Sequence, residues 1–166
     1  MLIVSDASPI IALAVCEKLD LLDKLFNQVC IPQAVYNELA IPGKPKASEI
    51  IKWAKDKVIP AKNTAVITAF SLTLDSGEAE ALSLYWEINA DFLLIDEKRG
   101  RTIALRNGIK TIGTLGVLLF AKQKELITDV RPLLDILAQN GFRVSDILYH
   151  QVLERAGEWH QIFGYT

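Results

Sequence analysis

Two aspartates stand where a catalytic carboxylate could be held, each directly after a short apolar run. Asp6 follows the run at 2–5, and Asp96 follows the run at 92–95. In open α/β sheets the ligand crevice lies outside the carboxyl ends of the strands, so both aspartates would face one crevice if their strands are neighbours. Either residue could instead serve only to stabilise the start of a helix through its dipole.

A third carboxylate is predicted to lie on the buried side of a helix. At 100° per residue, Glu78 falls in the middle of the apolar arc of a helix expected over 78–89, among Leu82, Ala81 and their neighbours. A carboxylate buried there is costly unless a cation, a metal or a proton compensates its charge. Glu80 falls on the polar face and is expected to be solvated.

Glu38 is a fourth candidate, because its helical neighbours Ala34 and Val35 place it at the edge of an apolar face. An exposed glutamate at a helix end is the alternative. Carboxylates that converge on one crevice repel each other unless they are neutralised, and hard divalent cations with oxygen ligands are the usual solution. The predicted catalytic and metal-binding set is Asp6, Glu38, Glu78 and Asp96, with Mg²⁺ or Mn²⁺ as the ion.

The elements that must position these acids follow from the apolar runs. Runs at 2–4, 29–31, 92–95 and 111–112 lack alternation, which favours strands buried on both faces of a parallel sheet, and the helical stretches between them indicate an α/β protein. Ser8 is predicted to cap the first helix, with Pro9 at its first position. Helices are expected over 9–17, 19–26, 32–39, 48–55, 78–89, 97–106, 114–124, 130–139 and 144–156, with a loop at 41–47 and a turn at 75–77.

Composition limits the classes of function. The 166 residues fit about one domain, and 51% hydrophobic with 23% charged residues predicts a folded core. The net charge of −2 gives no global basic field for nucleic acid, so any handling of phosphate must be local. Two cysteines without a CxxC pattern argue against disulfide frameworks and zinc sites. The apolar start has no basic leader and is interrupted by Asp6, so we expect a cytoplasmic protein with no membrane segment.

Several segments together resemble the PIN-domain family of metal-dependent ribonucleases, most closely the VapC-type toxin group or a nearby prokaryotic branch. They span roughly residues 1 to 120, in the family's order. The segments are LIVSDASPIIAL, PQAVYNEL, LDSGEAEAL, FLLIDEKRGRTIALRNG and TIGTLGVL.

The resemblance implies a three-layer α/β/α sandwich around a mainly parallel sheet. It implies a PIN-like nuclease domain at 1–128 and a C-terminal helical extension at 129–166 packed on that domain. The four acids named above would hold one or two ions that activate water for attack on an RNA phosphodiester, leaving a 5′-phosphate and a 3′-hydroxyl. A small antitoxin protein and a second copy of the chain are the partners that the resemblance implies.

One position departs from the family's pattern. Many members carry a further acid or an asparagine three residues after the last strand-end aspartate, and this chain has Arg99 there. The number of ions, one or two, therefore stays open.

The densest basic feature follows Asp96 directly and could hold RNA phosphates beside the acids. An ordinary solvated helix face explains it as well. Its members are Lys98, Arg99, Arg101 and Arg106. Lys44 and Lys46, in the loop at 41–47, could form a second substrate-gripping arm or belong to a plain surface loop.

Three further side chains are possible auxiliaries. Ser8 could bind a metal water near Asp6, and Glu80 is the second glutamate that the GEAEA segment offers. Thr114 could cap a helix or assist a metal water or a phosphate. The residues from Glu158 onward are expected to fray.

Two other classes of function remain possible. A non-catalytic binding module could keep the fold and use the C-terminal helices as a partner surface, a reading that the Arg99 departure motivates. A phosphotransfer domain of the receiver or haloacid-dehalogenase type also begins with a strand-end aspartate, but it predicts a second acid beside Asp6, where Ala7 and Ser8 stand. The sequence does not indicate which RNA a nuclease of this kind would cleave.

Overall fold

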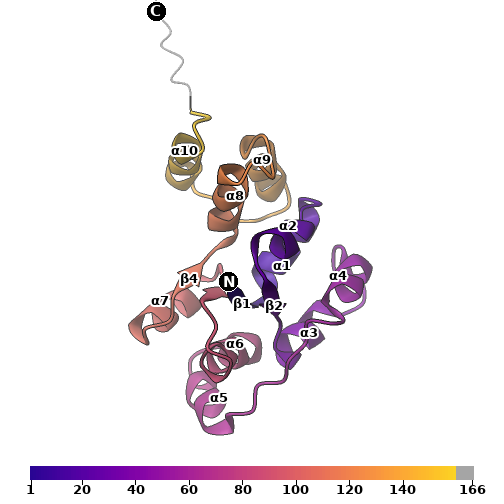
Figure 1. Ribbon diagram of the computed structural model, residues 1–166, viewed down its shortest axis with the longest axis vertical. Helices are drawn as coiled ribbons and strands as arrows, with labels where there is room; N and C mark the ends of the chain where they lie inside the picture. The colour runs from indigo at the N-terminus through magenta and orange to yellow at the C-terminus, as the bar shows by residue number, and fades with distance from the viewer. Residues whose placement is uncertain (160–166) are drawn as a thin grey trace, which may run out of the picture. The chain divides into compact units, whose positions relative to one another are not determined.

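The computed structural model describes residues 1–159, which form two compact units, Met1–Thr114 and a helical unit from Leu115 onward. The strands, all in the first unit, are β1 (Leu2–Ser5), β2 (Gln28–Cys30), β3 (Phe92–Leu94) and β4 (Thr111–Ile112) (Figure 1). The helices of that unit are α1 (Ala7–Val15), α2 (Asp20–Leu25), α3 (Gln33–Leu39), α4 (Ala47–Ala54), α5 (Thr64–Ser71), α6 (Ser76–Glu87) and α7 (Lys98–Arg106). From Thr114 on, the helices are α8 (Thr114–Gln123), α9 (Arg131–Gln139) and α10 (Asp146–Arg155). Among residues 1–159, no helix is long and apolar enough to cross a membrane.

The sheet is parallel throughout, with the strand order β2-β1-β3-β4. β1 lies between β2 and β3, with Ile3 paired to Val29 on one side and to Phe92 on the other. Because β1 and β3 are parallel neighbours, the residues that follow them emerge at the same edge of the sheet. The strands that precede Asp6 and Asp96 are therefore neighbours, which is the condition under which both aspartates would face one crevice.

Both faces of the central strands are covered. Ile3 and Val4 point to opposite faces of β1, and neither is exposed; the same holds for Leu93 and Leu94 of β3. Strands buried on both faces require helices above and below the sheet. The first unit is thus an α/β/α sandwich, as the resemblance implied, and its parallel sheet is the one that the apolar runs predicted.

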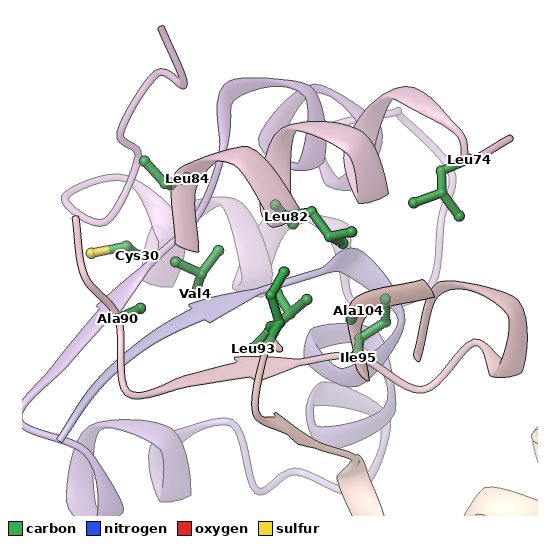
Figure 2. Close-up of a cluster of buried hydrophobic side chains, with 11 residues drawn as sticks. Val4, Cys30, Leu74, Leu82, Leu84, Ala90, Leu93, Ile95 and Ala104 are labelled. Carbon is green, nitrogen blue, oxygen red and sulfur yellow. The ribbon is translucent and has the colours of Figure 1, made fainter. Parts of the chain in front are cut away.

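A cluster of buried side chains fixes α6 to the sheet. Leu82 of α6 packs with Val4 of β1 and Leu93 of β3, while Ala104 joins them from α7 (Figure 2). Against its other sides α6 packs on α3 and α5, and Phe70 of α5 stacks on Trp86 at a ring-centroid distance of 5.8 Å. Because α6 is held from several sides, its first turn has a defined position relative to the ends of β1 and β3.

In the second unit, Glu158 ties the helices together. Its Oε1 accepts hydrogen bonds from Lys122 Nζ at 2.6 Å and from Val130 N at 2.7 Å, and its Oε2 accepts from Arg131 N at 2.8 Å. The expectation that the chain frays from Glu158 onward is wrong for Glu158 itself, because this carboxylate satisfies the free amides at the start of α9. Residues 160–166 lie outside the described residues.

The helix starts show where local sequence misled. α1 begins at Ala7 with Asp6 as its N-cap, so the predicted cap at Ser8 with Pro9 at the first position is wrong. The turn expected at 75–77 is wrong as well, since Asp75 caps α6 and Ser76 is its first residue. α5 was not expected at all. The division at residues 128 and 129, and the packing of the extension on the nuclease domain, stay predictions.

Candidate active site

Asp6 lies at the junction of β1 and α1, where the strand hands over to the helix. Its backbone N–H donates to Leu94 O at 2.9 Å, which keeps the strand pairing intact up to this residue. The residue is only 5% exposed. Burial raises the pKa of Asp6 from 3.8 to about 7; the Ala7 amide opposes the rise, and the negative charges of Asp75, Glu78 and Glu38 add to it. The pKa of the Asp6 carboxyl group therefore lies close to neutral pH.

Glu78 is the third residue of α6 and is 5% exposed, as its place on the apolar arc predicted. It forms a capping box with Asp75: Asp75 Oδ1 accepts from Glu78 N at 2.8 Å, and Glu78 Oε2 accepts from Asp75 N at 3.3 Å. Its other oxygen, Oε1, is buried without a hydrogen-bond partner within residues 1–159. Burial and then the Asp75 charge raise the pKa of Glu78.

Gly100 of α7 gives this unpartnered oxygen its space. A Cβ at position 100 would lie 2.5 Å from Glu78 Oε1 and 2.6 Å from Ile95 Cδ1, both well inside van der Waals contact. The backbone of α7 at Gly100 therefore packs against the Glu78 carboxylate and leaves no room for a side chain at position 100. The carboxylate lies between α6 and the first turn of α7, next to the residue that precedes Asp96.

Glu38 and Asp75 flank Gly77 on the more exposed side of the site. A Cβ at Gly77 would lie 3.5 Å from Glu38 Oε2 and 3.4 Å from Asp75 Oδ1. The side chain of Glu38 is 42% exposed, and its Oε1 lies 3.6 Å from Lys44 Nζ. Asp75, which the sequence did not single out, acts on Asp6 and Glu78 through its charge. Its spacing of three residues before a glutamate is the pattern of a capping box.

Asp96 is engaged by Thr114 from the start of α8. Thr114 N donates to Asp96 Oδ1 at 2.8 Å, and Thr114 Oγ1 donates to Asp96 Oδ2 at 2.5 Å. Gly113 allows this approach, since a Cβ there would lie 2.9 Å from Asp96 Oδ1 and 3.1 Å from Arg101 Nη1. Asp96 is thus oriented by two donors and has a guanidinium beside it.

The predicted acids come together in part. The charges of Glu78, Glu38 and Asp75 all act on Asp6, and the Asp75 charge also acts on Glu78. Asp96 follows the neighbouring strand and is bound to Thr114. Within residues 1–159, no three acidic, histidine or cysteine side chains converge closely enough to hold a metal ion. The donor set is nevertheless oxygen-rich, and Glu78 Oε1 has no hydrogen-bond partner among the described residues.

The basic residues of α7 differ in their surroundings. Lys98, Arg99 and Arg106 are exposed, whereas Arg101 is half-buried beside Asp96. The Arg99 charge opposes the rise in the pKa of Glu78, so Arg99 faces the same acid from the solvent side. These positions give the expected phosphate-binding feature two members near the acids.

The lysines of the loop at 41–47 lie against acidic side chains. Lys46 pairs with Glu17 at 3.0 Å and with Glu49 at 3.8 Å, while Lys44 pairs with Glu38. This favours the reading of a surface loop fixed by its own ion pairs over that of a free substrate-gripping arm.

The structure shows where the three auxiliary candidates lie. Ser8 is exposed and is not the cap that it was predicted to be. Glu80 was expected to be solvated, but its Oε2 accepts from Ala34 N at 2.8 Å, at the free amides that begin α3. Thr114, the third, is the residue that orients Asp96.

The chain matches a family model described as PIN domain over residues 2–158. The search of curated proteins found no match, and neither did the search of solved structures. The matched stretch includes every acid described above and reaches through α10. The chain therefore belongs to the PIN-domain family.

Proposed function

We propose that the chain is a divalent-metal-dependent endoribonuclease that hydrolyses RNA phosphodiesters. PIN domains are generally nucleases that use divalent metals. The observation that carries the proposal is Glu78, a carboxylate buried between two helices with one oxygen unpartnered. A structural carboxylate at such a depth would have that oxygen satisfied.

The residues present fit Mg²⁺ or Mn²⁺ in their chemistry. Hard divalent cations prefer carboxylate oxygens, and the strand ends and the first turn of α6 provide them. Asp6, Glu78 and Asp96 would hold the ion, with Glu38 beside them. When bound, the ion lowers the pKa of its water and neutralises charge on the phosphate oxygens.

The chain's own residues prepare this site. Asp6, with a pKa of about 7, carries a proton in part of the molecules at neutral pH, so binding of a cation would release it. Thr114 fixes both oxygens of Asp96, and Arg101 places a guanidinium beside that acid where a phosphate oxygen could be held. Arg99 adds a second guanidinium on the side of Glu78.

The test uses the purified full chain and a labelled single-stranded RNA. We expect cleavage in Mn²⁺ that stops with EDTA and falls at least about 100-fold in Asp6→Asn and Glu78→Gln. Asp91→Asn is the matched control, because Asp91 accepts from Leu2 N at the opposite end of the sheet and the change removes the same charge. Fragments with 5′-phosphates are expected. Cleavage that is indifferent to EDTA and to both site variants would contradict the proposal.

The finer biological assignment is part of the proposal. We infer that the chain is the toxin half of a toxin–antitoxin pair, with a small antitoxin protein and a second copy of the chain as its partners. The resemblance to the VapC-type toxin group supports this inference. Sedimentation of the purified chain measures the homodimer, and a monomer at every concentration tested would contradict it.

A non-catalytic PIN-fold binding module is the second candidate. It is favoured by the lack of three converging ligands within residues 1–159 and by Arg99 in place of an acid. Calorimetric titration with Mn²⁺ separates the two functions. A site lost in both Glu78→Gln and Asp96→Asn supports the nuclease, and the absence of ion binding by the wild-type chain supports the module.

A further inference from the structure

We propose that α5 is a flap that opens while α6 and the sheet stay folded, and that the Glu87 carboxylate holds it closed. The main packing partner of α5 is α6, beside which it lies (Figure 1). The opening is a property of the fold and does not depend on the proposed function.

The first argument is how little of α5 the core holds. None of its residues is buried, and it has no charged side chain that could pair with a neighbour. Phe70 is the residue of α5 that reaches the core cluster, where it is partly buried and stacks on Trp86. A helix of eight residues is marginal by itself, because most helical stability comes from packing an apolar face. The packing that keeps α5 in place is therefore slight.

The second argument is the way in which α6 holds the start of α5. Glu87 Oε1 accepts from Asn63 N at 3.0 Å, and Glu87 Oε2 accepts from Lys62 N at 2.9 Å. Ser83, one turn earlier on α6, donates to Glu87 Oε1 at 2.7 Å and orients the carboxylate. Bonds from backbone amides to a carboxylate are stronger than bonds between neutral groups. Within residues 1–159, every hydrogen bond between α6 and residues 60–73 ends on Glu87.

The third argument is that α5 lies between two anchored residues. Before it, Ile59 donates its backbone N–H to Ile31 O at 2.9 Å, and after it Leu74 is buried in the core cluster. Leu72, directly after α5, is 83% exposed. The segment between these anchors can leave α6 by a change of backbone conformation at its two ends. Local opening of this kind is expected where few buried apolar contacts hold an element.

Opening would change the surface of α6 and leave the acids in place. Trp86 is 39% exposed in the closed state and would lose the Phe70 ring that stacks on it. Leu74 would stay in the core, so Asp75 and Glu78, which follow it, would keep their capping box. The closed and open states thus differ on the outer side of α6.

The test is amide hydrogen exchange of the full chain, followed residue by residue by NMR under conditions in which exchange reports the population of open states. Glu87→Gln removes the carboxylate that holds the start of α5. Glu80→Gln is the matched control, because Glu80 is also a glutamate of α6 that accepts from a backbone amide, Ala34 N at the start of α3.

In wild type we expect the amides at 67–71 to exchange at least about tenfold faster than those of β1 and β3. Glu87→Gln should speed the exchange of the α5 amides by about a further tenfold, because bonds to a charged group are lost. The amides of β1, β3 and α6 should keep their rates. Glu80→Gln should leave the rates of the α5 amides unchanged.

Three results would overturn the inference. If the α5 amides of wild type exchange no faster than those of β1 and β3, α5 opens only when the whole unit unfolds. If Glu87→Gln leaves the α5 amides unchanged, the carboxylate does not hold α5 closed. If Glu87→Gln speeds the amides of α5 and of the sheet by the same factor, Glu87 contributes to the stability of the whole unit and α5 is not a flap.

Discussion

Two glutamates, one in each unit, show opposite ways of holding a carboxylate that is largely removed from solvent. Glu158 is 10% exposed at its side chain, and both of its oxygens accept hydrogen bonds from an ammonium group and two backbone amides. Glu78 is buried, yet its Oε1 has no hydrogen-bond partner within residues 1–159. One carboxylate is fully satisfied and the other is not.

Their proton affinities differ accordingly. Although burial raises the pKa of Glu158, the bonds from Lys122, Val130 and Arg131 outweigh it and the pKa is lowered. Burial and the Asp75 charge raise the pKa of Glu78. Because an unpartnered carboxylate is costly in the interior, Glu158 is explained by stability alone, whereas the charge of Glu78 must be compensated by a proton or a cation.

The largest expected effect comes from Asp6, which shares the environment of Glu78. It is the change that Asp6 causes in the free energy of unfolding as pH changes. The pKa of Asp6 is 3.8 when unfolded and about 7 when folded, so the folded state binds the proton more tightly. The free energy of unfolding should fall as pH rises from about 4 to about 7. Asp6→Asn should remove this slope and, near pH 8 in EDTA, stabilise the chain by up to about 4 kcal/mol. Urea unfolding across this pH range measures it, and an unchanged slope would contradict the prediction.

Glu158→Gln should have the next largest effect, with the opposite sign. The amide group of glutamine would turn a donor toward Lys122 Nζ or toward the α9 amides, and the ion pair would be lost. We expect a loss of about 2–3 kcal/mol, measured by urea unfolding. The stabilisation by Glu158 is complete above its unfolded pKa of 4.5 and is lost as pH falls through its lowered folded value. A neutral effect of Glu158→Gln would remove the contrast with Glu78.

The same substitution at Glu78 should stabilise the metal-free chain. Glu78→Gln removes a charge that burial and Asp75 oppose, so we expect the variant to be more stable than wild type near pH 8 in EDTA. In Mn²⁺ the order should reverse, because wild type gains binding energy that the variant lacks. Thermal unfolding with and without the ion measures both signs. A loss of stability in EDTA would place Glu78 with Glu158.

The smallest expected effect belongs to Glu80, two residues along α6. Glu80→Ala removes one hydrogen bond to Ala34 N and should cost about 1 kcal/mol in thermal unfolding. The affinity for Mn²⁺ should not change. If this variant bound Mn²⁺ tenfold more weakly, Glu80 would belong to the site. The distinction between acids with and without hydrogen-bond partners would then no longer hold.

The parts of the fold set by local periodicity could be predicted from the sequence. Apolar runs without alternation indicated the parallel strands, and their ends placed Asp6 and Asp96 at one edge of the sheet. The helical period placed Glu78 on the buried face, where the structure has it. These features depend only on neighbours within a few residues.

The parts set by tertiary contacts could not. Glu80 looked solvated because its partner, Ala34, is 46 residues away. α5 contains no charged residue and no buried one, so no buried face marks it; the sequence signal at its start is Asn63, whose Oδ1 accepts from Val66 N. The sequence did not reveal Asp75 as the N-cap of α6, because Asp-Ser-Gly is also a turn sequence. Only the pairing of Asp75 with Glu78 distinguishes the capping box from a turn.

At position 100 two requirements oppose each other: the stability of helix α7 favours a larger residue, and the space beside Glu78 requires glycine. Alanine would favour the isolated helix by about 1 kcal/mol, and most helical positions accept it. Here an added methyl group would meet Glu78 Oε1 at 2.5 Å. Attempts to stabilise this protein by replacing helical glycines should therefore spare position 100, and a scaffold designed to host the same buried acid would need its two helices equally close at that point.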